Sequence, residues 1–168
     1  MKIVLAIDGS KFSEDAINEL SGMSLPGDTE VCVLSVLENP LLTAPGAATL
    51  GSPLGNYYEE AVSIAQKSAE TIVKNAARSV KGKKPEISIT TEVIHGLPKS
   101  AILEKAENFG ADLIVVGSQG HGAFSRFLLG SVSQYIAMHA SCSVLIARKK
   151  IWKGILKNNK QTVLQHKN

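Results

Sequence analysis

The sequence predicts a doubly wound α/β fold, in which helices cover both faces of one parallel sheet. Short β-branched apolar runs alternate with helical patterns along the chain, which is typical of parallel strands joined by crossover helices. The runs at 3–7 and 113–116 are apolar at almost every position, which indicates strands buried on both faces. The chain has 168 residues, of which 44% are hydrophobic, and this suffices for a single domain with its own core.

Five strands and four helices are expected from these patterns. The strands are expected at residues 3–7, 31–37, 87–94, 113–116 and 144–147. The helices are expected at residues 13–22, 58–80, 98–109 and 131–140. Ser13 is expected to open the first helix, and Gly110 to end the third. The longest helix carries one apolar stripe, formed by Val62, Ala65, Ala69, Ile72, Val73, Ala76 and Val80.

Two segments lie outside this alternation. Residues 38–57, rich in Pro, Gly, Leu and Ala, are expected to form a surface loop or lid. Residues 148–168 carry seven of the 18 basic side chains and no acidic one, so the first 147 residues carry 11 basic and all 15 acidic side chains. The basic excess belongs to the tail, and nucleic-acid binding by the folded body is not indicated. We expect a domain over 1–147 and a solvated tail over 148–168, with contact between the tail and RNA, DNA or an anionic membrane as the alternative.

The sequence also bears on location and on metal binding. No apolar stretch approaches the roughly 20 residues of a membrane span, and the apolar run after Met1 is too short for a signal peptide. We therefore expect a cytoplasmic protein. Cys32 and Cys142 stand alone in apolar runs and are expected to be reduced cysteines of the core. His95 and His139 have no neighbours in ligand spacing, so no metal site made of protein side chains is predicted.

Glycine and serine gather where the fourth strand ends. In a doubly wound fold, ligands bind beyond the carboxyl ends of the strands, where the strand order reverses. Gly117 and Gly120 follow the fourth apolar run, and after nine more residues Gly130 and Ser131 open the last helix. Glycines let backbone amides approach an anion and tolerate positive φ, and a helix N-terminus offers unpaired amides. An anion site is predicted, with Ser131 and Ser133 as hydroxyl donors. The alternative is a flexible loop whose Gly130 allows close packing of helix on sheet.

Three segments resemble consensus segments of the universal stress protein family. They read IVLAIDGSKFSEDA, HGLPKSAILEKAENFGADLIVVGSQGHG and LLGSVSQYIAMHASCSVLIAR, and the resemblance extends from Ile3 to about Ala147. It implies a five-stranded sheet of order 3-2-1-4-5, and a homodimer paired through the strand near 143–147. Some members of the family bind ATP through a glycine-rich pattern, and others lack it.

The resemblance also implies roles for particular residues. The ATP-binding pattern of the family is matched by Gly117, Gly120, Gly130 and Ser131. The phosphates would be held by Gly117, Ser118, Gly120, Gly130, Ser131, Val132 and Ser133. Asp8 would contact the nucleoside, through the adenine amino group or a ribose hydroxyl, and the backbone at Val36 would meet the adenine. Asp8, in Asp-Gly-Ser, also suits a turn or a helix cap, and both roles are compatible. Arg126 would either neutralise the distal phosphates or be an exposed loop cation, and His121 lies in the same loop.

We expect a binding protein rather than an enzyme. The chain has no Gly-Lys-Ser/Thr P-loop, and the stretch Gly-Ser-Val-Ser-Gln at 130–134 lacks the closing glycine of a nucleophile elbow. The predicted ligand is ATP or AMP, with Mg²⁺ as a companion of ATP. The nucleotide would be a conformational or partner-recruiting signal in the stress response, with at most slow turnover. The alternatives are a slow ATPase or autokinase that uses Ser131 or Ser133 as phosphoacceptor, and a dimeric interaction scaffold whose glycine loop is empty in the cell.

Overall fold

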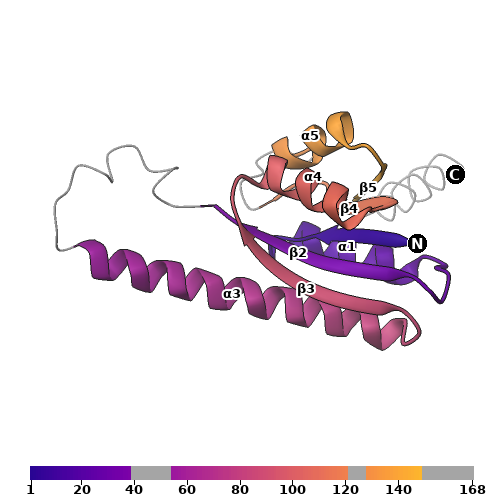
Figure 1. Ribbon diagram of the computed structural model, residues 1–168, viewed down its shortest axis with the longest axis horizontal. Helices are drawn as coiled ribbons and strands as arrows, with labels where there is room; N and C mark the ends of the chain where they lie inside the picture. Colours follow the sequence, from indigo (N-terminus) through magenta and orange to yellow (C-terminus); the bar gives the residue numbers. More distant parts are fainter. Residues whose placement is uncertain (39–53, 121–127, 149–168) are drawn as a thin grey trace, which may run out of the picture.

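The fold is built around one parallel sheet of five strands. The strand order is β3-β2-β1-β4-β5 in the computed structural model, which describes residues 1–38, 54–120 and 128–148 (Figure 1). The strands are β1 (Lys2–Ala6), β2 (Glu30–Leu37), β3 (Ser88–His95), β4 (Leu113–Gly117) and β5 (Ser143–Ala147). All neighbouring strands pair in parallel. The predicted fold class and the strand order are both confirmed.

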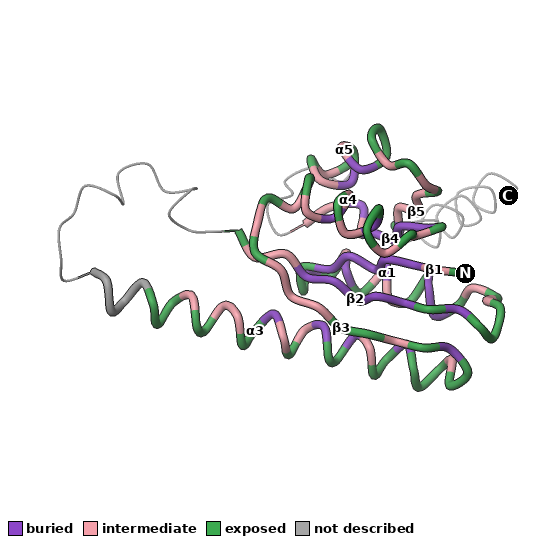
Figure 2. The backbone as a smooth tube through the Cα atoms, viewed as in Figure 1, coloured by how far each residue is buried: buried purple, intermediate pink, exposed green. Residues whose placement is uncertain are grey.

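Two helices cover each face of this sheet. The helices are α1 (Lys11–Gly22), α3 (Leu54–Lys83), α4 (Pro98–Phe109) and α5 (Ser131–His139). Successive residues of a strand point to opposite faces, so Ile3 and Leu5 pack with α1 and α3, whereas Val4 and Ala6 pack with α4 and α5. Figure 2 shows buried positions gathered in the central strands, which agrees with the continuous apolarity of the first and fourth runs.

The long helix α3 is longer than predicted, and only part of it lies over the sheet. It begins at Leu54, so residues 54–57, expected to belong to the loop, are helical, while residues 39–53 lie outside the described part of the chain. Its buried apolar positions are Ala69, Val73, Ala76 and Val80. Val62 and Ala65 are only partly buried, because the N-terminal part of α3 extends beyond the carboxyl ends of β2 and β3 (Figure 1). The predicted stripe becomes core only where the helix covers strands.

The first helix begins two residues earlier than predicted, because Ser10 rather than Ser13 is its N-cap. Ser10 Oγ accepts a hydrogen bond from Ser13 N at 3.3 Å. Gly110 ends α4 as predicted, in a left-handed conformation with φ of 67°. Apart from the starts of α1 and α3 and the end of α3, which lies at Lys83 rather than at residue 80, the predicted boundaries agree with the structure to within one residue.

The strand order reverses at β1. From β1 the chain moves to β2 and β3 on one side, and it later returns to β4 on the other side of β1. The segment after β1 leads to α1 on one face of the sheet, and the segment after β4 leads to α5 on the opposite face. In doubly wound folds, ligands bind between two such diverging segments. The predicted site residues follow these same two strands.

Besides residues 39–53, two predicted features fall outside the described residues. They are the basic tail, apart from Arg148, and the loop that contains His121 and Arg126. No helix in the described part of the chain is long and apolar enough to cross a membrane.

Candidate functional site

Asp8 lies just after β1, in the turn that leads into α1. Its Oδ1 accepts hydrogen bonds from Ser10 N at 2.9 Å and from Ser13 Oγ at 2.6 Å. The backbone N–H of Asp8 donates in turn to Ser13 Oγ at 2.9 Å. Asp8 therefore takes the turn role that the sequence allowed, while the cap role belongs to Ser10. The residue is nevertheless exposed, so its carboxylate can also meet a ligand.

Gly117, the last residue of β4, allows α1 to approach the sheet. A Cβ at this position would lie 2.6 Å from Phe12 O and 2.7 Å from Phe12 C, which is closer than real Cβ contacts. The first turn of α1 would have to move to accept it. The described glycines with positive φ are Gly9, Gly96 and Gly110. The described glycines of the pattern, Gly117, Gly120 and Gly130, therefore do not use the positive φ that glycine tolerates, and the close approach of neighbouring segments explains them instead.

Gly120 brings the segment after β4 against the turn after β1. A Cβ on Gly120 would lie 2.8 Å from Asp8 Oδ2. The two residues are remote in the sequence, but β1 and β4 pair in parallel with Ala6 beside Val116, so the segments that follow them meet. Asp8 and the glycine pattern, both predicted to bind the same ligand, are neighbours in the structure.

The N-terminus of α5 is tied to the end of β4 through Ser118. Gly130 N donates a hydrogen bond to Ser118 O at 2.8 Å, and Ser133 Oγ donates to the same oxygen at 3.0 Å. A Cβ on Gly130 would lie 3.1 Å from Gln119 Cα, so close packing is one reason for this glycine. The amides of the first turn of α5 have no acceptor within the helix and lie at the positive end of its dipole. They belong to Ser131, Val132 and Ser133.

The two predicted hydroxyl donors differ in their surroundings. Ser133 is 3% exposed, and its Oγ lies 3.0 Å from the carbonyl oxygens of both Ser118 and Gly130. A hydroxyl has one hydrogen to donate, and that of Ser133 is directed into the protein. The backbone amide is therefore the group of Ser133 best placed for an anion. Ser131 is exposed, and its hydroxyl stays the predicted donor.

Val36 lies on β2 beyond the end of β1. Within the described residues, the ladder between β1 and β2 ends with the bond from Ile7 N to Leu34 O at 2.9 Å. Alternate residues of a strand direct their backbone groups to the same side, so the N–H and C=O of Val36 face the side on which Leu34 meets β1. Past Ile7 this side is taken by the turn that contains Asp8. The backbone of Val36 is thus presented next to that turn.

The structure therefore gathers the predicted residues from three segments at one edge of the sheet. These segments are the turn after β1, the end of β2, and the end of β4 with the start of α5. Sequence reasoning missed Ser10 and Ser13 as partners of Asp8, although their spacing in Asp-Gly-Ser-Lys-Phe-Ser was visible. It also missed Gln119, whose Nε2 donates to Leu128 O across the ends of the loop.

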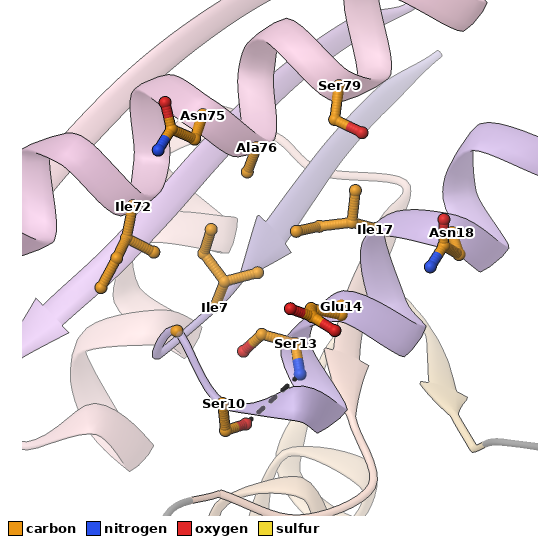
Figure 3. A pocket seen from close by; sticks show the side chains of 11 residues that line it. Ile7, Ser10, Ser13, Glu14, Ile17, Asn18, Ile72, Asn75, Ala76 and Ser79 are labelled. Carbon is orange, nitrogen blue, oxygen red and sulfur yellow. Dashed lines mark hydrogen bonds between the residues drawn. The ribbon is translucent and has the colours of Figure 1, made fainter.

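A separate groove of about 310 Å³ lies between α1 and α3 (Figure 3). Its lining includes the apolar side chains of Ile7, Ile17, Ile72 and Ala76 and the polar side chains of Ser10, Ser13, Glu14, Asn18, Asn75 and Ser79. None of the predicted nucleotide-binding residues lines it. Gly9, next to Asp8 in the chain, also lines the groove; its φ is 82°, and a Cβ there would lie 2.6 Å from Ile72 Cδ1. The groove and the predicted site share only the β1–α1 turn.

Three titratable groups away from this edge, Cys32, Lys105 and Cys142, have raised pKa values. Lys105 of α4 forms an ion pair with Glu92 of β3, and the hydrogen bond between them raises the pKa of Lys105. Both cysteines are free thiols, with Cys32 buried and Cys142 partly buried. Burial raises the pKa of each thiol, which disfavours the reactive thiolate. Over the described ranges, no group of three or more His, Cys, Asp and Glu side chains could hold a metal ion.

The sequence has relatives over most of its length. The model of the universal stress protein family matches residues 1–148. A protein of Staphylococcus epidermidis named as a universal stress protein is 32% identical over 149 residues, which cover 87% of this chain and 82% of the relative.

Several solved structures share the fold. The universal stress protein UspA from Lactobacillus plantarum superposes with a TM-score of 0.68 at 22% identity, covering 88% of this chain and 97% of the other. A universal stress protein in complex with cAMP gives 0.61 at 23% identity, covering 88% and 96%. A family protein from Arabidopsis thaliana with AMP bound gives 0.58 at 18% identity, covering 90% and 93%. These similarities concern the fold, and the ligands are those of the compared proteins.

Proposed function

The chain belongs to the universal stress protein family, and on that basis we propose that it binds an adenine nucleotide, ATP or AMP, as a module of the cytoplasmic stress response. The bound nucleotide would be a conformational or partner-recruiting signal, with little or no turnover. Support comes from two family structures of the same fold, which hold cAMP and AMP.

The observation that carries this proposal is the contact between Asp8 and the glycine segment. Asp8 Oδ2 lies 2.8 Å from the position of a Cβ on Gly120, and the same segment is bonded through Ser118 O to the start of α5. A carboxylate acceptor thus lies beside a set of backbone amides. A nucleotide needs this combination, because its nucleoside offers amino and hydroxyl donors while its phosphates need N–H donors.

The proposed roles follow from this placement. Asp8 would accept a hydrogen bond from the nucleoside, and the backbone of Val36 would meet the adenine. The phosphates would be held in the segment that includes Gly117, Ser118, Gly120, Gly130, Ser131, Val132 and Ser133. The N–H groups of Ser131, Val132 and Ser133 would be donors there, whereas those of Ser118 and Gly130 already donate to Ala147 O and Ser118 O. Mg²⁺ would accompany ATP through the phosphate oxygens, since phosphates and water commonly complete its coordination.

The proposal is tested by the small-molecule content of the protein and by titration. Protein purified without added nucleotide is denatured, and the released compounds are identified by mass spectrometry. Calorimetric titration of nucleotide-free protein with ATP, AMP and cAMP then gives affinities, with GTP as the control for base selectivity. We expect retained or readily rebound adenine nucleotide and weaker GTP binding. Absence of adenine nucleotide from the purified protein, together with no heat on titration, would contradict the proposal.

A second candidate function is slow ATP hydrolysis or autophosphorylation. For autophosphorylation, Ser131 is the better placed of the two predicted phosphoacceptors. Ser131 is exposed at the start of α5, whereas the Ser133 hydroxyl is engaged inside the protein. Incubation with ATP, followed by measurement of ADP and of protein mass, separates this function from binding alone. We expect neither ADP above the blank nor a phosphorylated species. A phosphate on Ser131 that is lost in Ser131→Ala would establish the autokinase instead.

We also propose that the protein is a homodimer paired through β5. This strand is at the edge of the sheet, and Val144, Leu145 and Ile146 are only partly buried. An unpaired apolar edge favours association with other chains, and pairing about a two-fold axis closes it. If the titrations above gave no binding, a dimer that forms without nucleotide would support the alternative function, a dimeric interaction scaffold.

A further inference from the structure

Ser13 makes two hydrogen bonds to the same residue. Its Oγ donates to Asp8 Oδ1 at 2.6 Å and accepts from the backbone N–H of Asp8 at 2.9 Å. Ser13 is 4% exposed, so protein groups rather than water set the orientation of its hydroxyl. Ser10 N donates to the same Asp8 Oδ1 at 2.9 Å. One oxygen of the Asp8 carboxylate is therefore held by two donors from the start of α1.

The position of the other oxygen follows from this arrangement. With Oδ1 fixed toward α1, Oδ2 is directed to the opposite side, where it lies 2.8 Å from a virtual Cβ on Gly120. An Asp side chain has two rotatable bonds, and hydrogen bonds at one oxygen fix both the position and the plane of the carboxylate. The fixed plane presents Oδ2 to the segment after β4.

The backbone of the turn is held by other contacts. Ser10 Oγ caps α1 through Ser13 N, and Gly9 packs against Ile72 Cδ1 of α3. Neither contact uses the Ser13 hydroxyl. Removing that hydroxyl takes away one of the two donors to Asp8 Oδ1 and the acceptor of the Asp8 N–H, while the N-cap of α1 and the packing of Gly9 still hold the turn.

We propose that Ser13 is a positioning residue, which fixes the Asp8 carboxylate for a hydrogen bond to the amino or hydroxyl group of a nucleoside; this rests on the proposed nucleotide function. Ser13 does not itself touch the ligand. A fixed acceptor binds more tightly than a rotating one, because the ligand does not have to order it. The loss of Ser13 should thus weaken binding of the nucleoside part and leave binding of the phosphates unchanged.

The test compares Ser13→Ala with Ser21→Ala. Ser21 is a matched control, since it is buried in the same helix, donates its hydroxyl to Ile17 O at 2.7 Å, and lies at the far end of α1. Affinities for ATP, adenosine and inorganic tripolyphosphate are measured by calorimetry on each full-length variant. We expect Ser13→Ala to weaken ATP and adenosine by about tenfold, as for the loss of one well-formed hydrogen bond, without changing tripolyphosphate affinity. Ser21→Ala should change none of the three affinities.

Two further variants separate positioning from a purely structural role. In an Asp8→Ala background, Ser13→Ala should have no additional effect on adenosine affinity, because the group that it positions is gone. Ser13→Thr keeps the hydroxyl and should restore affinity, which covers the case in which Ser13→Ala does not fold. Unchanged adenosine affinity in Ser13→Ala, or an equal loss with and without Asp8, would overturn the inference while leaving the nucleotide function intact. A wild-type protein that binds no adenine nucleotide would overturn both.

Discussion

Gly117 lies where β4 meets the first turn of α1, and a methyl group there would lie 2.6 Å from Phe12 O. The obstacle is backbone, so it cannot rotate away as a side chain would. We expect Gly117→Ala to destabilise the protein by about 1–3 kcal/mol, as for overpacking of a dense interior. Urea denaturation followed by circular dichroism measures this change.

Gly82 provides the control for Gly117. It lies in α3, has no positive φ, and a Cβ there would meet nothing within 4 Å. Gly82→Ala should stabilise the protein by about 0.5–1 kcal/mol, because alanine loses less backbone entropy in a helix than glycine. Equal effects of the two substitutions would show that the approach of α1 to β4 does not require glycine.

The position of the N-terminus of α5 depends on one network of hydrogen bonds. Gly130 N and Ser133 Oγ both bond Ser118 O, so the first turn of the helix is fixed to the end of β4. Amides fixed in this way need no reorganisation when an anion binds, which is the advantage of a preformed site.

Gly130→Val should therefore separate phosphate binding from nucleoside binding. A Cβ at Gly130 would already lie 3.1 Å from Gln119 Cα, and a branched side chain would push the first turn of α5 away from β4. We expect ATP and AMP affinity to fall by at least about tenfold, as for the loss of a well-formed hydrogen bond, with adenosine affinity unchanged. Calorimetry on each ligand measures this. Ser131→Ala keeps the amide and should cost much less, and full ATP affinity in Gly130→Val would argue against the amides as the phosphate site.

The long helix shows why an element must be considered with its neighbours. Apolar spacing alone continues the stripe of α3 to Val62, yet burial of its apolar positions begins at Ala69. The difference arises because strands of eight residues are shorter than a helix of 30 residues, so the helix extends past the sheet.

For the whole molecule, the open edge of the sheet is the feature that governs assembly. Ser143 N donates to Asp112 O, and Ala147 O accepts from Ser118 N, so these residues of β5 face β4. Val144 and Ile146 alternate with them and direct their backbone groups to the open edge. Proline at Val144 would thus remove an outward N–H without breaking the bonds to β4.

Val144→Pro should convert the proposed dimer into a monomer with unchanged nucleotide affinity. Light scattering coupled to gel filtration measures the mass, with Val144→Thr as a control that keeps the N–H. A wild-type protein that is monomeric, or a Val144→Pro variant that stays dimeric, would contradict pairing through the β5 edge.

Much of the fold could be predicted from the sequence, because the local periodicity of apolar residues indicates the strands and helices. The apolar runs located all five strands, and Gly110 marked the end of α4. The edge of the sheet where the candidate site lies was also predictable, since Asp8, Gly117 and Gly120 lie at or just after strand ends and parallel strands end at a common edge.

Which residues contact one another within the candidate site is determined by the tertiary structure. The sequence does not show whether a glycine is needed for positive φ or for the close approach of a neighbouring segment. At Gly117, the packing of Phe12 in the structure shows that close approach is the reason. Likewise, Ser13 was assigned to the start of a helix, but its hydroxyl bonds Asp8 because the turn folds the helix start back onto the strand end. Periodicity reports which face of an element is buried. Which atoms meet depends on distances between segments that only the packed sheet and helices fix.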